Sequence, residues 1–73
     1  MNVTALEQNR EAIVIAIRDD RHLNRLRSSG IRPGANIELV GRTSSRGFLV
    51  KVDDTRLVLG YEIAEKICCA YNS

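Results

Sequence analysis

The stretch RLRSSGIRPG, residues 25–34, decides where a short predicted helix ends and where the following strand begins. Gly30 is placed to end the helix in the left-handed conformation, and Ile31 can then fold back onto the last helical turn. Pro33 prevents the helix from resuming, and the pair Pro33-Gly34 is typical of a type II turn. The sequence therefore predicts a fold-determining turn at Gly30, Pro33 and Gly34.

A helix is expected just before this turn. Asp19 or Asp20 can cap its N-terminus, because a carboxylate accepts hydrogen bonds from free backbone N–H groups and complements the helix dipole. Leu23 and Leu26 are three residues apart and lie on one face of a helix. We expect that face to pack against the rest of the molecule.

Most of the remaining chain is typical of strands joined by turns. Apolar and polar residues alternate in the later stretches, and β-branched residues fill the first. The expected strands are residues 11–19, 35–41, 47–53, 55–60 and 66–71, with one helical or 3₁₀ turn within 61–67. Asn9 tolerates the left-handed conformation and is expected to mark the bend into the first strand.

These elements predict a mainly β fold. We expect a small SH3-like barrel of about five antiparallel strands, with a short α-helix between strands 1 and 2 and a helical turn before the last strand. The chain has 73 residues, so residues 1–73 are expected to form a single domain. The residues expected to face inward are Ile37, Leu39, Phe48, Val50, Val52, Leu57, Leu59, Ile63, Ala64, Ile67 and Cys69.

Positive charge is concentrated around the predicted helix, although the net charge of the chain is only +2. Nine of the eleven cations are arginines, and Arg18, Arg21, Arg25, Arg27 and Arg32 lie within fifteen residues. Only Asp19 and Asp20 oppose them there. Such a zone favours an anionic partner, and it is also typical of a solvated helix face.

Catalytic and metal-binding patterns are missing from the sequence. It contains no nucleophile elbow and no phosphate-binding glycine loop, so no enzymatic activity is expected. His22, Cys68 and Cys69 are the only histidine and cysteines, and neighbouring residues on a strand point to opposite faces. We therefore expect no metal site and no cofactor. The apolar runs are too short to span a membrane, and the free cysteines favour a cytoplasmic location.

The stretches LRSSGIRPGANIELV and GFLVKVDDTRLVLGYEIAEKI resemble the FeoA family, ferrous iron transport protein A. The matching residues in the first stretch are Leu26, Gly30, Ile31, Pro33 and Gly34, and those in the rest are Ile37, Leu39, Val50, Val52, Leu57, Leu59, Ala64 and Ile67. Three positions depart from the family pattern: Asn9, Ser29 and Asp54. The resemblance implies an SH3-like barrel that assists the ferrous iron permease FeoB, a membrane protein with a GTP-binding domain, and so a link to transition metal ions. A similar barrel forms the C-terminal domain of iron-dependent repressors.

The sequence leaves several binding functions open. The first hypothesis is contact with the cytoplasmic part of an FeoB-type permease through the arginines Arg18, Arg21, Arg25 and Arg32. The alternatives are a small barrel that uses the same arginines for nucleic acid, although no aromatic residue interleaves with them, and a stand-alone regulatory domain related to the repressors. Weak self-association is also possible through residues expected to face outward, namely Val40, Leu49 and Val58. Under the first hypothesis, we expect neither nucleic-acid binding nor direct insertion into a membrane.

Overall fold

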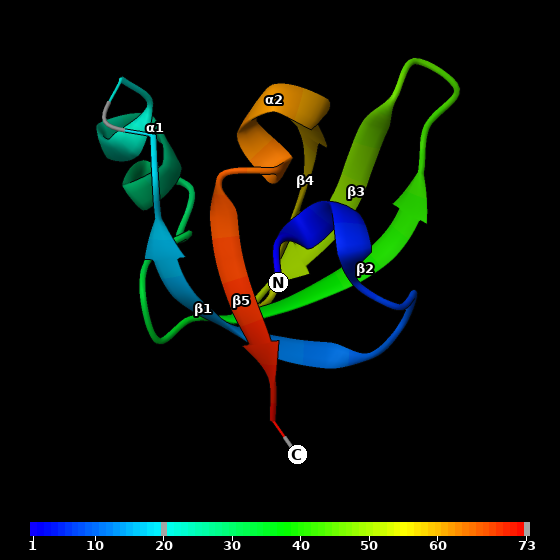
Figure 1. Cartoon of the computed structure of the whole chain (residues 1–73), viewed down its shortest axis with the longest axis horizontal. Helices are drawn as coiled ribbons and strands as arrows, with labels where there is room; N and C mark the ends of the chain where they lie inside the picture. Colours follow the sequence, from blue (N-terminus) through cyan, green and yellow to red (C-terminus); the bar gives the residue numbers. More distant parts are fainter. Residues whose placement is uncertain (20, 73) are drawn as a thin grey trace.

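The computed structural model describes residues 1–19 and 21–72 of the chain. Eight elements follow in order: η1 (Val3–Ala5), β1 (Glu11–Ile17), α1 (Leu23–Ser28), β2 (Asn36–Arg42), β3 (Gly47–Val52), β4 (Thr55–Gly60), α2 (Tyr61–Ala64) and β5 (Ile67–Tyr71). Figure 1 shows the five strands curling around a common interior, with α1, α2 and the turn between β2 and β3 at the same end. The predicted mainly β fold with five antiparallel strands is confirmed.

The strands form one sheet in the order β4-β3-β2-β1-β5. β1 lies between two neighbours, because it pairs with β2 at one end and with β5 along most of its length. The register shifts between Val14 and Ala16 in β1, and between Leu39 and Gly41 in β2. Such bulges bend a strand and increase its twist, so they help the sheet to curl.

The barrel is bridged by short helices at its open side. Among the described residues, β4 and β5 form no ladder with each other. Instead α2 contacts β4 and η1, and η1 contacts β5. Asn2 also pairs with Cys68, and the N–H of Cys69 donates to the carbonyl of Met1 at 2.7 Å. The N-terminal residues therefore cover the edge of β5, which protects it from pairing with other chains.

The core is a single cluster of aliphatic side chains with Phe48 at its margin. The alternation read from the sequence is confirmed on β2 and β3, where Ile37, Leu39, Val50 and Val52 are buried. Cys69 is buried as expected and Leu57 is half-buried. Val3 and Leu6 are also buried, and they come from the N-terminal segment that forms η1.

The start of α1 differs from the expectation. The helix begins at Leu23, and its N-cap is His22, which makes no capping hydrogen bond through its side chain. Asp19 is not a cap, because its carboxylate binds the backbone N–H of Arg21 and the ring of His22 before the helix begins. Asp20, the other expected cap, lies outside the described residues.

The end of α1 has the hydrogen bonds of a Schellman motif. The N–H of Ile31 donates to the carbonyl of Leu26 at 2.9 Å, and the N–H of Gly30 donates to that of Arg27 at 3.0 Å. Gly30 has a φ of +93°, which only glycine adopts without strain. The next turn is closed by a 3.0 Å bond from the Ala35 N–H to the Arg32 carbonyl, and Gly34 there also has a φ of +93°.

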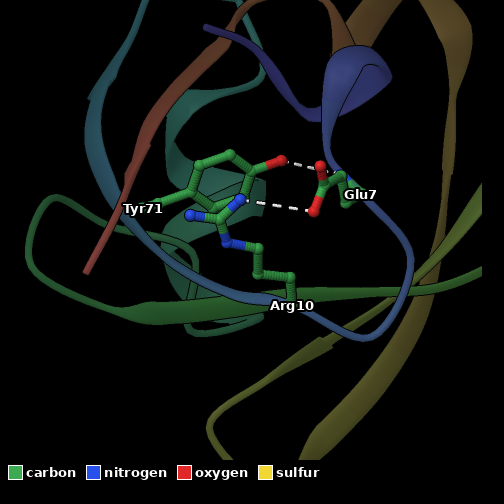
Figure 2. Close-up of polar contacts among 3 residues, drawn as sticks. All are labelled: Glu7, Arg10 and Tyr71. Atoms are coloured by element: carbon green, nitrogen blue, oxygen red, sulfur yellow. Dashed lines mark hydrogen bonds and ion pairs between the residues drawn. The ribbon is translucent and has the colours of Figure 1, made fainter. Parts of the chain in front are cut away.

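A surface clasp joins the segment before β1 to the end of the chain (Figure 2). The hydroxyl of Tyr71 accepts a hydrogen bond of 2.8 Å from the N–H of Glu7. The guanidinium carbon of Arg10 lies 3.6 Å from the centre of the Tyr71 ring, and one of its nitrogens lies 3.3 Å from the Glu7 carboxylate. Asn9, between them, has a φ of +67°. The clasp therefore holds the bend into β1 against β5.

No helix in residues 1–19 and 21–72 is long and apolar enough to cross a membrane.

Candidate functional site

A surface cleft of about 420 Å³ lies where three distant segments of the chain meet. They are the segment before α1, the turn between β2 and β3, and α2 with the residues that follow it. Figure 1 shows these segments at the same end of the barrel. The charged and aromatic residues that line the cleft are Asp19, Arg21, His22, Arg46, Tyr61, Glu62 and Lys66.

Asp19 and His22 are hydrogen-bonded to each other in the lining of this cleft. The Asp19 side chain is only 4% exposed, and one of its oxygens accepts a hydrogen bond of 2.8 Å from Nδ1 of His22. The other oxygen accepts the N–H of Arg21 at 2.9 Å. The bond from His22 lowers the pKa of the Asp19 carboxyl below its ordinary value of 3.8, and the N–H of Arg21 lowers it further against the opposing effect of burial. Asp19 therefore orders the chain before α1.

Low pH should weaken the contribution of Asp19 to the stability of the fold. The folded-state pKa of Asp19 is depressed, so its stabilising effect is present above 3.8 and is lost as the pH falls through the lower, folded-state value. We expect Asp19→Asn to be less stable than the wild type at neutral pH, and the difference to shrink below pH 3.8. Urea unfolding of both proteins from neutral pH to below pH 3.8 measures the difference in the free energy of unfolding. Asp54→Asn is the control for loss of one acidic charge. A difference that stays constant into strong acid would contradict the assignment.

Two arginines make cation–π contacts near this end of the barrel, and one of these contacts, Arg46 with Tyr61, lines the cleft. The guanidinium carbon of Arg46 lies 4.9 Å from the centre of the Tyr61 ring, and that of Arg42 lies 5.8 Å from the centre of the Phe48 ring. The centres of the Phe48 and Tyr61 rings are 6.2 Å apart. Arg46 has a φ of +66°, a strained conformation for a residue with a side chain. Sequence reasoning missed Arg46, Tyr61 and Lys66, because no local pattern links them to Arg21.

The structure separates the four arginines that the sequence singled out. All four are exposed, and only Arg21 lines the cleft. The backbone N–H of Arg18 donates to the carbonyl of Lys66 at 2.8 Å, so its Cα lies beside the cleft wall. Arg25 lies on α1, and a guanidinium nitrogen of Arg32 donates to the carbonyl of Gly30 at 3.2 Å. Their role in binding a partner stays a prediction.

The apolar residues expected to face outward are unequally exposed. Val58 is 58% exposed, whereas Val40 and Leu49 are half-buried. Leu49 lies directly opposite Val58 on the neighbouring strand. Self-association through these residues stays a prediction as well.

The two cysteines lie in different environments. Cys69 is 2% exposed, and burial raises the pKa of its thiol above the ordinary 9.0. Cys68 is half-buried, and both thiols are free. Within the described ranges, no group of three or more His, Cys, Asp or Glu side chains could hold a metal ion.

This difference predicts selective labelling. A thiol reagent should modify Cys68 first in the native protein, because the thiolate is the reactive form and Cys69 is both buried and harder to deprotonate. Mass spectrometry of peptides after timed alkylation measures the order. Unfolding in urea should make the two cysteines react at similar rates. Faster native labelling of Cys69 would contradict the predicted burial.

The comparison with protein families decides the relationship. The family model of the FeoA domain matches residues 1–71 of this chain. This chain belongs to the FeoA domain family. The resemblance noted in the sequence is therefore confirmed, and it covers almost the whole chain. No curated protein matches the sequence significantly.

Solved structures of FeoA proteins share this fold. The FeoA protein of Chlorobium tepidum has a TM-score of 0.90 and 19% identity, with 100% of this chain and 71% of that chain covered. FeoA of Stenotrophomonas maltophilia complexed with zinc, described as a procaryotic SH3 domain protein, has a TM-score of 0.81 and 24% identity, with 96% and 89% covered. The expected SH3-like barrel is confirmed.

A metal-dependent repressor contains a similar barrel. The apo form of the manganese-activated repressor ScaR has a TM-score of 0.85 and 20% identity. The match covers 97% of this chain and 35% of the repressor. At this identity the likeness between the FeoA domain and the repressor concerns the fold alone.

Proposed function

We propose that this protein is a cytoplasmic accessory protein of ferrous iron transport, which acts by contact with the GTP-binding part of an FeoB-type permease. Membership of the FeoA family supports this role. The related protein of Stenotrophomonas maltophilia is described as possibly acting as a ferrous iron transport activating factor. The proposal treats residues 1–73 as a single FeoA-like domain that binds its partner and catalyses no reaction.

The exposed arginines on and beside α1 are the observation that carries the proposed contact. Arg18, Arg21, Arg25 and Arg32 all reach solvent, and the described acid in the same stretch, Asp19, is buried and bound to His22. Their charge is therefore available to an acidic surface. Guanidinium groups pair well with carboxylates, because the planar fork can donate two parallel hydrogen bonds.

Charge reversal tests this contact. We expect Arg21→Glu and Arg25→Glu together to weaken capture of the permease's soluble domain by about tenfold or more, since each reversal replaces an attraction with a repulsion. Binding is measured by pull-down and by calorimetry, with far-UV circular dichroism to check the fold. Arg56→Glu, on the exposed side of β4, is the control. Undiminished capture by the double variant would exclude α1 as the contact.

Nucleic-acid binding is the second candidate, and one observation favours it. Tyr61 is 40% exposed and lines the same cleft as Arg21, so an aromatic ring lies near an arginine after all. Proteins that bind single strands combine such rings with basic grooves. Filter binding at several salt concentrations tests this function, because phosphate contacts give a steep dependence on salt.

A further inference from the structure

We propose that the cleft binds an extended acidic peptide segment, one carboxylate of which is held by Arg21, Arg46 and Lys66. This inference rests on the proposed function, because it assumes that the protein acts by contact, and it names the chemistry of the segment that enters. It assigns a binding role to Arg46, Tyr61 and Lys66, which lie outside the helical arginine zone.

The charge balance of the cleft favours an anion. Asp19 already accepts hydrogen bonds from His22 and from the N–H of Arg21, and it is almost completely buried. Glu62 is the one remaining acid among the residues that line the cleft, and it faces three cations. Across the described part of the chain, Arg21, Arg46 and Lys66 make no ion pair within 4.0 Å. With Asp19 counted and His22 neutral, the residues that line the cleft carry three positive and two negative charges, which leaves a formal excess of one positive charge.

The geometry of Arg46 suits a planar acceptor. Its guanidinium carbon lies 4.9 Å from the centre of the Tyr61 ring, a cation–π contact, and Arg46 is exposed, so its N–H groups can reach a ligand. A stacked guanidinium is already ordered, so less side-chain freedom is lost when it forms two hydrogen bonds to a carboxylate.

The same cleft offers apolar surface for a neighbouring side chain. Tyr61 and Ile63 both line it, and Tyr61 is 40% exposed while Ile63 is half-buried. Both come from α2, which the core holds through Ala64 at 0% exposure. A segment in which acidic and apolar residues alternate would place a carboxylate on the cations and an apolar group on α2.

An acidic peptide fits the surface better than a long polyanion. The net charge of the chain is only +2, so the basic surface in and around the cleft is balanced by acidic residues elsewhere on the barrel. Glu11 lies directly opposite Glu38 on the sheet. Asp53 and Asp54 lie in the turn between β3 and β4. A nucleic acid long enough to cross this part of the sheet would meet these acids, whereas a short peptide confined to the cleft would not.

A peptide titration tests the proposal on the full chain. The probe is an acetylated and amidated peptide of alternating Glu and Leu, and the matched probe has Gln in place of Glu. We expect the Glu peptide alone to shift the amide NMR signals of Arg21, Arg46, Tyr61 and Lys66. Arg46→Ala and Lys66→Ala should each weaken binding by about threefold to tenfold, as for a partly exposed charged hydrogen bond. Arg56→Ala should leave it unchanged.

One variant should act in the opposite direction. Glu62→Gln removes a negative charge from the residues that line the cleft and so reduces repulsion of a carboxylate. It should strengthen binding of the Glu peptide about twofold to fivefold, the range of a weak, solvent-exposed charge interaction. A purely structural role of Glu62 would not produce this gain. Weaker binding by Glu62→Gln with an intact fold would overturn the charge argument.

The remaining outcomes separate this inference from the proposed function. Three outcomes would each overturn the carboxylate site. They are equal binding of the two peptides, no shift of the amide NMR signals at millimolar peptide, and tighter binding of a single-stranded oligonucleotide. Shifts confined to Arg25 and its neighbours on α1 would also overturn it and would leave the permease contact standing. Peptide binding in the cleft without any capture of the permease domain would overturn the proposed function alone.

Discussion

Ile31→Ala is expected to lower the free energy of unfolding by about 2–5 kcal/mol. Ile31 is 0% exposed, and its N–H donates to the carbonyl of Leu26 at the end of α1. The substitution removes a buried aliphatic group from the point where the helix is joined to the barrel, and a well-packed core closes such a cavity only in part. A chain of 73 residues typically has about 4–11 kcal/mol of stability, so the loss is a large share of it.

The control is the same substitution at an exposed position. Ile15 is 56% exposed on β1, so Ile15→Ala should change the free energy of unfolding by less than about 0.5 kcal/mol. Urea unfolding followed by circular dichroism gives both values from the midpoints at constant slope. Equal effects of the two substitutions would show that Ile31 does not anchor the helix end.

Gly47→Ala is expected to lower the free energy of unfolding by about 1–3 kcal/mol, the usual cost of overpacking. A Cβ atom at Gly47 would lie 2.6 Å from Oγ1 of Thr43 and 3.0 Å from a methyl group of Val58. Oγ1 of Thr43 accepts the N–H of Gly47 at 2.8 Å, so rotating Thr43 away would break that bond. The turn that carries Arg46 should therefore loosen.

Gly41→Ala is the matched control on the neighbouring strand. A Cβ atom there meets no heavy atom within 4 Å, and its φ is not in the left-handed region. The variant should keep the stability of the wild type or gain up to about 1 kcal/mol, because alanine restricts the unfolded chain. In the Gly47→Ala background, Thr43→Ala should cost less than it does alone, since the two residues clash. Additive effects would argue against the predicted contact.

The strands and the turn after α1 could be predicted because their signals are local. A period of two along β2 and β3 places Ile37, Leu39, Val50 and Val52 on one face, whatever the rest of the chain does. The glycines at positions 30 and 34 predict positive φ from the sequence alone, because glycine is the residue that adopts this conformation without strain, and both have a φ of +93°. Asp19 does not cap α1 as predicted, because its carboxylate accepts hydrogen bonds from His22 and from the N–H of Arg21 before the helix begins.

The cleft could not be predicted, because it is made by curvature. Arg21, Arg46, Tyr61 and Lys66 come from three segments that meet only after the sheet curls. The bulges in β1 and β2 contribute to that curl. Gly41 in β2 is a residue type typical of a bulge, whereas the residues around the bulge in β1 give no such signal. The four arginines near α1 were visible as a group, but only Arg21 lines the cleft.

The amino-acid sequence by itself determined the five strands, the turn after α1, most of the inward faces and the membership of the FeoA family, because alternation and turn residues act over a few positions. Tertiary structure alone decided which charges are neutralised and which remain available. Asp19 is bound to His22, whereas Arg46 stacks on Tyr61 beside Lys66. The physical reason is that electrostatic and stacking partners are chosen by distance in space, which the bend of the sheet sets, and not by distance along the chain.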